Sequence, residues 1–106
     1  MTTGISVVIP TYNRDKLLER CIDSVLHTIG ESDEIVVVDG GTTGKTESVI
    51  DSYNDVRIRY IYHENEGVSA ARNVGMEVAK NDLIAFIDDD DEWHPSKLKT
   101  FSKDHF

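Results

Sequence analysis

The sequence predicts an α/β fold: a mostly parallel sheet of about four strands, with helices on both faces. Short runs of β-branched and aliphatic residues recur near positions 5–9, 34–38, 56–62 and 83–87. The stretches between them carry apolar residues at helical spacing. This alternation of strands and helices is typical of parallel sheets with right-handed crossovers, in which helices cover both faces.

The first predicted strand covers residues 5–9 and ends at Pro10. Its continuous apolar character indicates burial on both faces. A helix is expected next and ends near Gly30. Its apolar positions are Leu17, Leu18, Cys21, Ile22, Val25, Leu26 and Ile29. We interpret Cys21, the single cysteine, as an inert core thiol, and its isolation favours an intracellular protein without disulfides.

The second predicted strand, residues 34–38, leads to Asp39 and a glycine loop at 40–41. A helix is expected to follow, capped by one of the threonines at 42–43 and ending near Tyr53. Both glycines favour a turn at this point, because they tolerate tight backbone conformations.

The third predicted strand, residues 56–62, alternates apolar and arginine residues and is expected near a sheet edge. A small-residue helix over 68–79 and a fourth buried strand over 83–87 follow. Pro95 suits the first turn of a last helix. The apolar positions of that helix are Leu98 and Phe101.

Length and charge limit the class of protein. The chain has 106 residues, enough for one domain (residues 1–106) but not two. The formal net charge of -9 argues against binding to a nucleic-acid backbone. It fits either a cation-binding protein or an ordinary soluble one. No window resembles a signal peptide or a membrane span, so we expect a cytoplasmic protein.

Unusual residues follow three of the predicted strands: 10–13, 39–41 and 88–91. In parallel sheets, ligands bind beyond the carboxyl ends of the strands, where the strand order reverses. If the first and fourth strands are neighbours, the segments 10–13 and 88–91 face one crevice. This convergence predicts a binding site at that edge of the sheet.

Four consecutive aspartates, Asp88 to Asp91, come directly after the fourth apolar run. Carboxylate oxygens are the ligands that hard divalent cations prefer. Asp88 and Asp90 stand two positions apart, so in an extended chain both point toward one ion. The alternative is a polar loop, or aspartates that cap the helix expected near Pro95.

Two common nucleotide-binding motifs are missing from the sequence. Neither G-x-G-x-x-G nor G-x-x-x-x-G-K-[ST] occurs, which argues against a dinucleotide site and a P-loop. Arg72, one turn into the third predicted helix, suits a phosphate or carboxylate; the alternative is a surface pair with Glu66 or Glu77. His94, beside the acidic run, is either a ligand or an exposed loop residue.

Taken together, these motifs resemble the N-terminal half of a GT-A-fold glycosyltransferase of the inverting family 2. The resemblance extends over nearly the whole chain. The matching stretches are S-V-V-I-P-T-Y-N-R (6–14), E-I-V-V-V-D (34–39), N-E-G-V-S-A-A-R-N-V-G (65–75) and F-I-D-D-D-D (86–91).

The resemblance implies transfer of a sugar from a nucleoside diphosphate sugar, a UDP-sugar first, to the hydroxyl of a saccharide or lipid-linked acceptor. Asp90, with Asp88 beside it, is implied as the ligand of Mg²⁺ or Mn²⁺. Asp91 would support or cap the next turn. The implied donor-binding residues are Pro10, Thr11, Tyr12, Asp39, Arg72, Asp88 and Asp89.

Two departures from the family pattern bear on function. The usual Asp-Asp-Gly-Ser after the second strand is replaced by Asp39-Gly40-Gly41-Thr42, which removes a carboxylate. Family members are also about twice as long, so we expect the general base beyond Phe106 and little transfer by this chain alone. The full-length protein would then associate peripherally with the inner membrane face.

Two other functions were weighed. A module that binds nucleotide or metal without catalysis has the same donor-side residues. A receiver domain would need acidic residues after an early strand, whereas the first strand here ends in Pro10-Thr11-Tyr12. A sheet that stops at the fourth strand would also expose an open edge and promote self-association.

Overall fold

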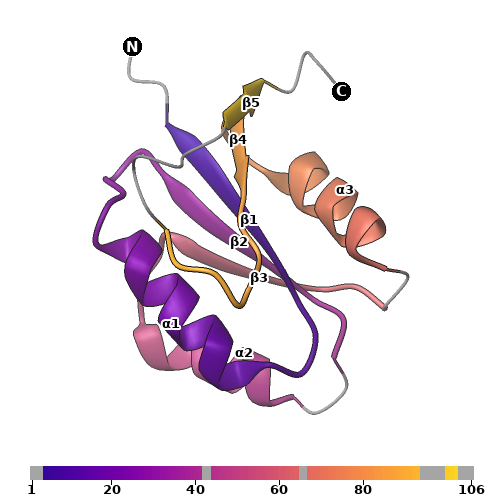
Figure 1. Cartoon of the computed structure of the whole chain (residues 1–106). Coiled ribbons are helices and arrows are strands. Elements are labelled where there is room, and N and C mark those ends of the chain that lie inside the picture. Colours follow the sequence, from indigo (N-terminus) through magenta and orange to yellow (C-terminus); the bar gives the residue numbers. More distant parts are fainter. Residues whose placement is uncertain (1–3, 42–43, 65–66, 94–99, 103–106) are drawn as a thin grey trace.

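A computed structural model describes residues 4–41, 44–64, 67–93 and 100–102. These residues form one sheet with strand order β3-β2-β1-β4-β5 (Figure 1). The first four strands run parallel, and the last is antiparallel to its neighbour. The predicted fold class is therefore confirmed. The strands are β1 (Ile5–Thr11), β2 (Glu34–Asp39), β3 (Ile58–Tyr62), β4 (Leu83–Phe86) and β5 (Thr100–Ser102).

In the part of the chain that the structure describes, three helices cover the two faces of the sheet: α1 (Asp15–Leu26), α2 (Lys45–Tyr53) and α3 (Val68–Val78). The first two lie together on one face, and α3 lies on the other (Figure 1). Among the described residues, no helix is long and apolar enough to cross a bilayer. Strand β1 pairs with β2 on one side and β4 on the other, so the strand order reverses at β1.

Alternation along the strands divides the core in two. Val7 and Ile9 of β1 point toward α1 and α2, whereas Val8 between them points toward α3. All three side chains are fully buried. Successive strand residues face opposite sides of a sheet, so one uninterrupted apolar run supplies both cores.

Helix α3 approaches the sheet closely at Gly75. A Cβ atom at this position would fall well inside van der Waals contact with Val8 Cγ1. Glycine therefore lets the helix backbone rest directly on β1. This close packing fixes the start of α3 relative to the carboxyl end of that strand.

Glu34 anchors the opposite end of the sheet. Its side chain is buried and accepts hydrogen bonds from Ser6 Oγ (2.6 Å), the Lys80 N–H (2.6 Å) and Arg59 Nη1 (3.0 Å). Burial alone raises the pKa of a carboxyl, but these hydrogen bonds and the arginine charge outweigh burial and lower the pKa of Glu34. The network joins β1, β2 and β3 to the segment that leads into β4.

The prediction of a last helix was wrong at Phe101. Residues Thr100–Ser102 form β5, whose backbone pairs with residues 83–85 of β4. Three residues are too few for apolar periodicity to distinguish a helix from a strand. The same pairing corrects the expected open edge at the fourth strand. Pro95 and Leu98 lie outside the described residues.

Several other predicted boundaries shift, among them the end of α1, which is Leu26 rather than a position near Gly30. The third strand starts at Ile58 rather than residue 56, because Val56 belongs to an exposed turn before it. Its place at the sheet edge is confirmed. Helix α2 starts at Lys45, with Gly44 as its N-cap in the left-handed region (φ 75). The threonines at 42–43 lie outside the described residues.

Candidate functional site

A cavity of about 320 Å³ opens at the carboxyl ends of the parallel strands, where the strand order reverses. It brings together the turn after β1, the loop after β2, the start of α3 and the acidic turn, which we define as residues 88–91. The lining residues are Pro10, Thr11, Tyr12, Arg14, Gly40, His63, Glu64, Gly67, Val68, Ala71, Asp88, Asp89 and Asp90.

Six of the eight residues predicted for the site line this cavity. The two that do not are Asp39 and Arg72, although Gly40 and Ala71 beside them do. The first and fourth strands pair, which meets the condition under which the segments 10–13 and 88–91 were expected to face one crevice. His94 and Glu66 lie outside the described residues.

Asp89 holds the acidic turn to the end of β1. Its side chain is only 8% exposed. Asp89 Oδ2 accepts a 2.8 Å hydrogen bond from Thr11 Oγ1, and Oδ1 lies 3.4 Å from Arg14 Nη1. Because both oxygens are engaged by the protein, this aspartate positions the turn.

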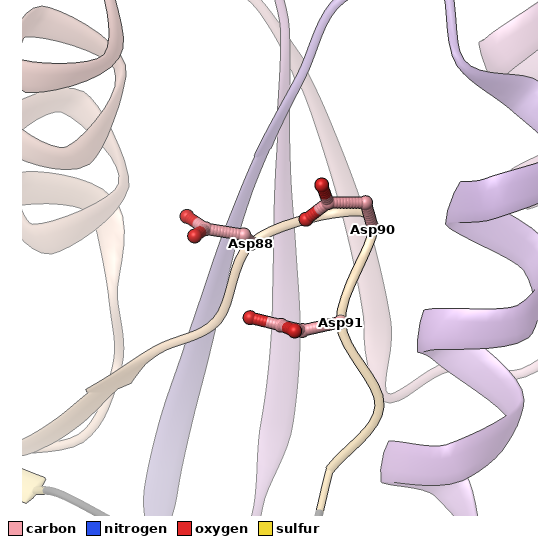
Figure 2. A group of neighbouring side chains, drawn as sticks. All are labelled: Asp88, Asp90 and Asp91. Atoms are coloured by element: carbon pink, nitrogen blue, oxygen red, sulfur yellow. The ribbon is translucent and has the colours of Figure 1, made fainter.

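The other three aspartates converge. One carboxylate oxygen each from Asp88, Asp90 and Asp91 lies within 4.8 Å of the others. The Asp91 N–H donates to the Asp88 carbonyl (3.0 Å), which closes the turn. In the view of Figure 2 all three side chains extend toward the left, Asp88 from one arm of the turn and Asp90 and Asp91 from the other. Three exposed oxygen donors in this arrangement fit a hard divalent cation such as Mg²⁺ or Mn²⁺.

The closeness of Asp91 to the other two was not predicted. The sequence indicated a pair two positions apart, as in an extended strand. The turn instead folds Asp91 back, and a tight turn cannot be inferred from four identical residues. Asp91 thus becomes a candidate ligand beside Asp88 and Asp90.

Two arginines flank the acidic turn. Arg72 Nη2 lies 3.2 Å from Asp88 Oδ1, and the guanidinium stands 5.8 Å from the centre of the Phe86 ring. Among the described residues, Arg72 therefore pairs with a carboxylate of the acidic turn. Arg14 Nη1 reaches Asp90 Oδ2 at 3.8 Å in addition to Asp89. Arg14 was missed, although it directly follows the turn predicted to bind.

Cys21 lies beneath the acidic turn. It is fully buried, as predicted, and its thiol donates to the Asp88 carbonyl at 3.6 Å. Burial, and then the charges of Asp89 and its three neighbours, raise the pKa of the Cys21 thiol to about 12. The thiol is therefore neutral at physiological pH and supports the turn by packing and a weak hydrogen bond.

Asp39 orients the glycine loop. It is buried, and its Oδ1 accepts the Gly41 N–H (2.8 Å) while its Oδ2 accepts the Tyr60 hydroxyl (2.6 Å). Burial, followed by this hydrogen bond, raises the pKa of Tyr60. A Cβ at Gly41 would overlap Asn13 Oδ1, so a larger residue where the two loops meet would displace the Asn13 side chain. Tyr60 was missed because β3 gives no pattern that singles it out.

Comparison with known proteins supplies the family. The protein-family model described as "Glycosyl transferase family 2" matches residues 6–103 of this chain. The chain belongs to this family. The GT-A fold that the sequence resemblance implied is confirmed by solved glycosyltransferase structures.

Curated relatives carry glycosyltransferase names. Validoxylamine A glucosyltransferase of Streptomyces hygroscopicus subsp. limoneus is 46% identical over 89 residues, 79% of this chain and 20% of its own length. The putative colanic acid biosynthesis glycosyl transferase WcaA of Escherichia coli is 39% identical over 100 residues, 92% of this chain and 36% of its own length. The chain therefore spans about a fifth to a third of these family 2 relatives.

Two solved structures share the fold. S. aureus TarS 1-349 in complex with UDP-GlcNAc has a TM-score of 0.76 and 26% identity, covering 84% of this chain and 27% of that chain. The mannosyltransferase PcManGT from Pyrobaculum calidifontis, in complex with GDP-Man and Mn²⁺, has a TM-score of 0.76 and 26% identity, covering 88% and 29%.

Proposed function

We propose that this chain is the donor-binding part of a glycosyltransferase that uses a nucleoside diphosphate sugar, a UDP-sugar first, with Mg²⁺ or Mn²⁺. The carrying observation is the convergence of Asp88, Asp90 and Asp91 beside the cavity at the strand-order reversal. The bound UDP-GlcNAc of one structural neighbour and the GDP-Man and Mn²⁺ of another support this proposal.

In this proposal the nucleoside binds at the carboxyl end of β1. Pro10 and Tyr12 offer apolar surface to a base, and the Tyr12 side chain is about half exposed. Asp39 acts from behind the glycine loop, where its hydrogen bond with the Gly41 N–H holds the loop that would lie against the nucleoside.

The acidic turn faces the diphosphate in this proposal. Asp90, Asp88 and Asp91 supply oxygen ligands, Asp89 holds the turn through Thr11, and Arg72 contributes positive charge beside the phosphates. A divalent cation bound there supplies Lewis-acid stabilisation of the departing nucleoside diphosphate.

The acceptor and the general base belong to the whole protein. We propose a saccharide or lipid-linked acceptor, a cytoplasmic location with peripheral membrane association, and a base outside residues 1–106. The second candidate, a nucleotide- and metal-binding module without transfer, rests on the same cavity and acidic turn. Sugar transfer by the 106-residue chain with UDP-sugar and Mn²⁺ would contradict that candidate.

The donor site is tested by titrating ¹⁵N-labelled protein with UDP, GDP and dTDP, with and without Mg²⁺. We expect metal-dependent shifts at the amides of Thr11, Asp39, Arg72 and Asp90. Substoichiometric Mn²⁺ should broaden residues 88–91 first, and Asp90→Asn should abolish this broadening. Asp51→Asn, on exposed helix surface, is the control of equal charge. Absence of any metal-dependent shift with all three nucleotides would contradict the proposal.

A further inference from the structure

Arg14 lies where the cavity meets the acidic turn. It lines the cavity, and its side chain is 53% exposed. Asn13, directly before it, has a positive φ of 52° and turns the chain away from β1. We propose that Arg14 and the divalent cation compete for Asp90, and that a nucleoside diphosphate relieves this competition by accepting the Arg14 guanidinium. This inference rests on the proposed function.

The Arg14 guanidinium makes two long contacts with the acidic turn, and the one with Asp89 is the shorter. Nη1 lies 3.4 Å from Oδ1 of Asp89, which is nearly buried and fixed on its other oxygen by Thr11. The same Nη1 lies 3.8 Å from Oδ2 of Asp90, whose side chain is 53% exposed. Exposed pairs at such distances contribute little. The contact with Asp90 is therefore the one that gives way.

A cation held by Asp88, Asp90 and Asp91 would stand within a few ångströms of this guanidinium. Two positive charges at that range repel, and both would draw on the same Asp90 carboxylate. Arg14 thus weakens binding of the bare cation. A residue that only supports the metal site would instead strengthen binding of the bare cation.

A bound diphosphate would reverse the effect of Arg14 on cation affinity, from weakening to strengthening. It brings negative charge to the cavity rim, and the planar guanidinium matches two phosphate oxygens at once. Asp89 keeps the Arg14 side chain at the rim while the guanidinium exchanges Asp90 for phosphate. Arg14 would therefore be a phosphate-binding residue that makes cation and nucleotide binding mutually dependent.

Arg20 provides a matched control. It also pairs with a carboxylate next to the acidic turn, Glu92, and is 66% exposed, but it does not line the cavity. Arg20→Gln removes one positive charge from the same neighbourhood. It therefore reports the general electrostatic effect of charge removal without the contact to Asp90.

The experiment measures two affinities in each variant: Mn²⁺ alone, by electron paramagnetic resonance, and UDP at saturating Mn²⁺, by calorimetry. Arg14→Gln should bind Mn²⁺ about two- to five-fold more tightly than Arg20→Gln does. It should bind UDP about ten-fold more weakly than wild type, with uridine affinity unchanged. Arg14→Lys keeps the charge, so its Mn²⁺ affinity should match wild type while UDP binding falls about three-fold.

Weaker binding of both Mn²⁺ and UDP in Arg14→Gln would overturn the inference, because Arg14 would then only hold the turn. Unchanged affinities in a folded variant, checked by circular dichroism, would overturn it as well. If Arg14→Gln does not fold, the UDP and uridine affinities of Arg14→Lys decide. Failure of wild type to bind UDP or GDP with Mn²⁺ would instead contradict the proposed function, and the Mn²⁺ comparison still tests competition at Asp90.

Discussion

Individual side chains beneath the acidic turn keep its carboxylates in place without competing for a ligand. Cys21 donates to the backbone of Asp88, and Thr11 donates to Asp89. Both are neutral donors at physiological pH, so they add no charge below the three exposed carboxylates. The inner aspartate is thus fixed, while the carboxylates of Asp88, Asp90 and Asp91 stay exposed above it, the first two beside arginines.

Cys21 should be almost unreactive in the native protein. A pKa of about 12, raised from 9.0, leaves very little thiolate between pH 7 and 9, and the side chain is buried. We expect iodoacetamide to label the native protein roughly a hundred-fold or more slowly than the urea-unfolded chain. A native labelling rate within ten-fold of the unfolded rate would contradict the described burial.

Replacing Glu34 should destabilise the fold and flatten its acid dependence. Glu34→Gln weakens three hydrogen bonds to a buried carboxylate, and we expect a loss of about 2–3 kcal/mol in urea unfolding at pH 7. The exposed Glu31→Gln is the control and should change stability by less than about 0.5 kcal/mol.

The direction of the pH effect follows from the lowered pKa of Glu34. Its stabilisation is complete above the unfolded pKa of 4.5 and is lost as pH falls through the lower folded pKa. The stability difference between wild type and Glu34→Gln should therefore shrink as pH falls below about 4.5. A difference that grows on acidification would show that another group dominates.

At the scale of elements, α3 links the core to the site. Its Gly75 rests on Val8 of β1, while Val68 and Ala71 at its start line the cavity. Arg72 on the same turn pairs with Asp88. Close packing in the middle of the helix thus sets the position of its amino end against the acidic turn.

Gly75→Ala tests this packing. Alanine favours an isolated helix by about 1 kcal/mol over glycine, yet the new methyl group would overlap the fully buried Val8. We expect overpacking to win and to destabilise the protein by about 1–3 kcal/mol in urea unfolding. Glu77→Ala, on the exposed side of α3, should stay within about 0.5 kcal/mol of wild type.

At the scale of the whole molecule, the strand order β3-β2-β1-β4-β5 decides where the charges meet. The net charge of -9 is spread over the chain, but the reversal at β1 places four consecutive aspartates at the rim of the cavity. A divalent cation at that rim would relieve local repulsion more than monovalent salt does.

Thermal unfolding should report this difference. We expect millimolar Mn²⁺ to raise the midpoint above that in NaCl of equal ionic strength, because an ion that binds only the folded state stabilises it. Chelation of Mn²⁺ with EDTA should remove this additional increase in the unfolding midpoint. Asp90→Asn should lose most of it, and Asp51→Asn should keep it. Equal excess in both variants would indicate nonspecific binding.

Much of the fold was readable from the chain because buried parallel strands are continuous apolar runs. Four strands and the three helices between them were predicted, and the crevice between 10–13 and 88–91 was expected if the first and fourth strands were neighbours. The strand at Thr100–Ser102 was not predicted. It is held by backbone hydrogen bonds to β4, and a three-residue sequence gives no pattern that indicates such pairing.

Within the site, the sequence by itself determined which residue types gather beyond the strands, because strand ends and turns are local features. Only the tertiary structure decided their individual geometry. It folds Asp91 back beside Asp88, fixes Asp89 under Thr11 and brings Arg14 to Asp90. These contacts depend on how neighbouring strands align and on one tight turn, and neither is encoded in spacing along the chain.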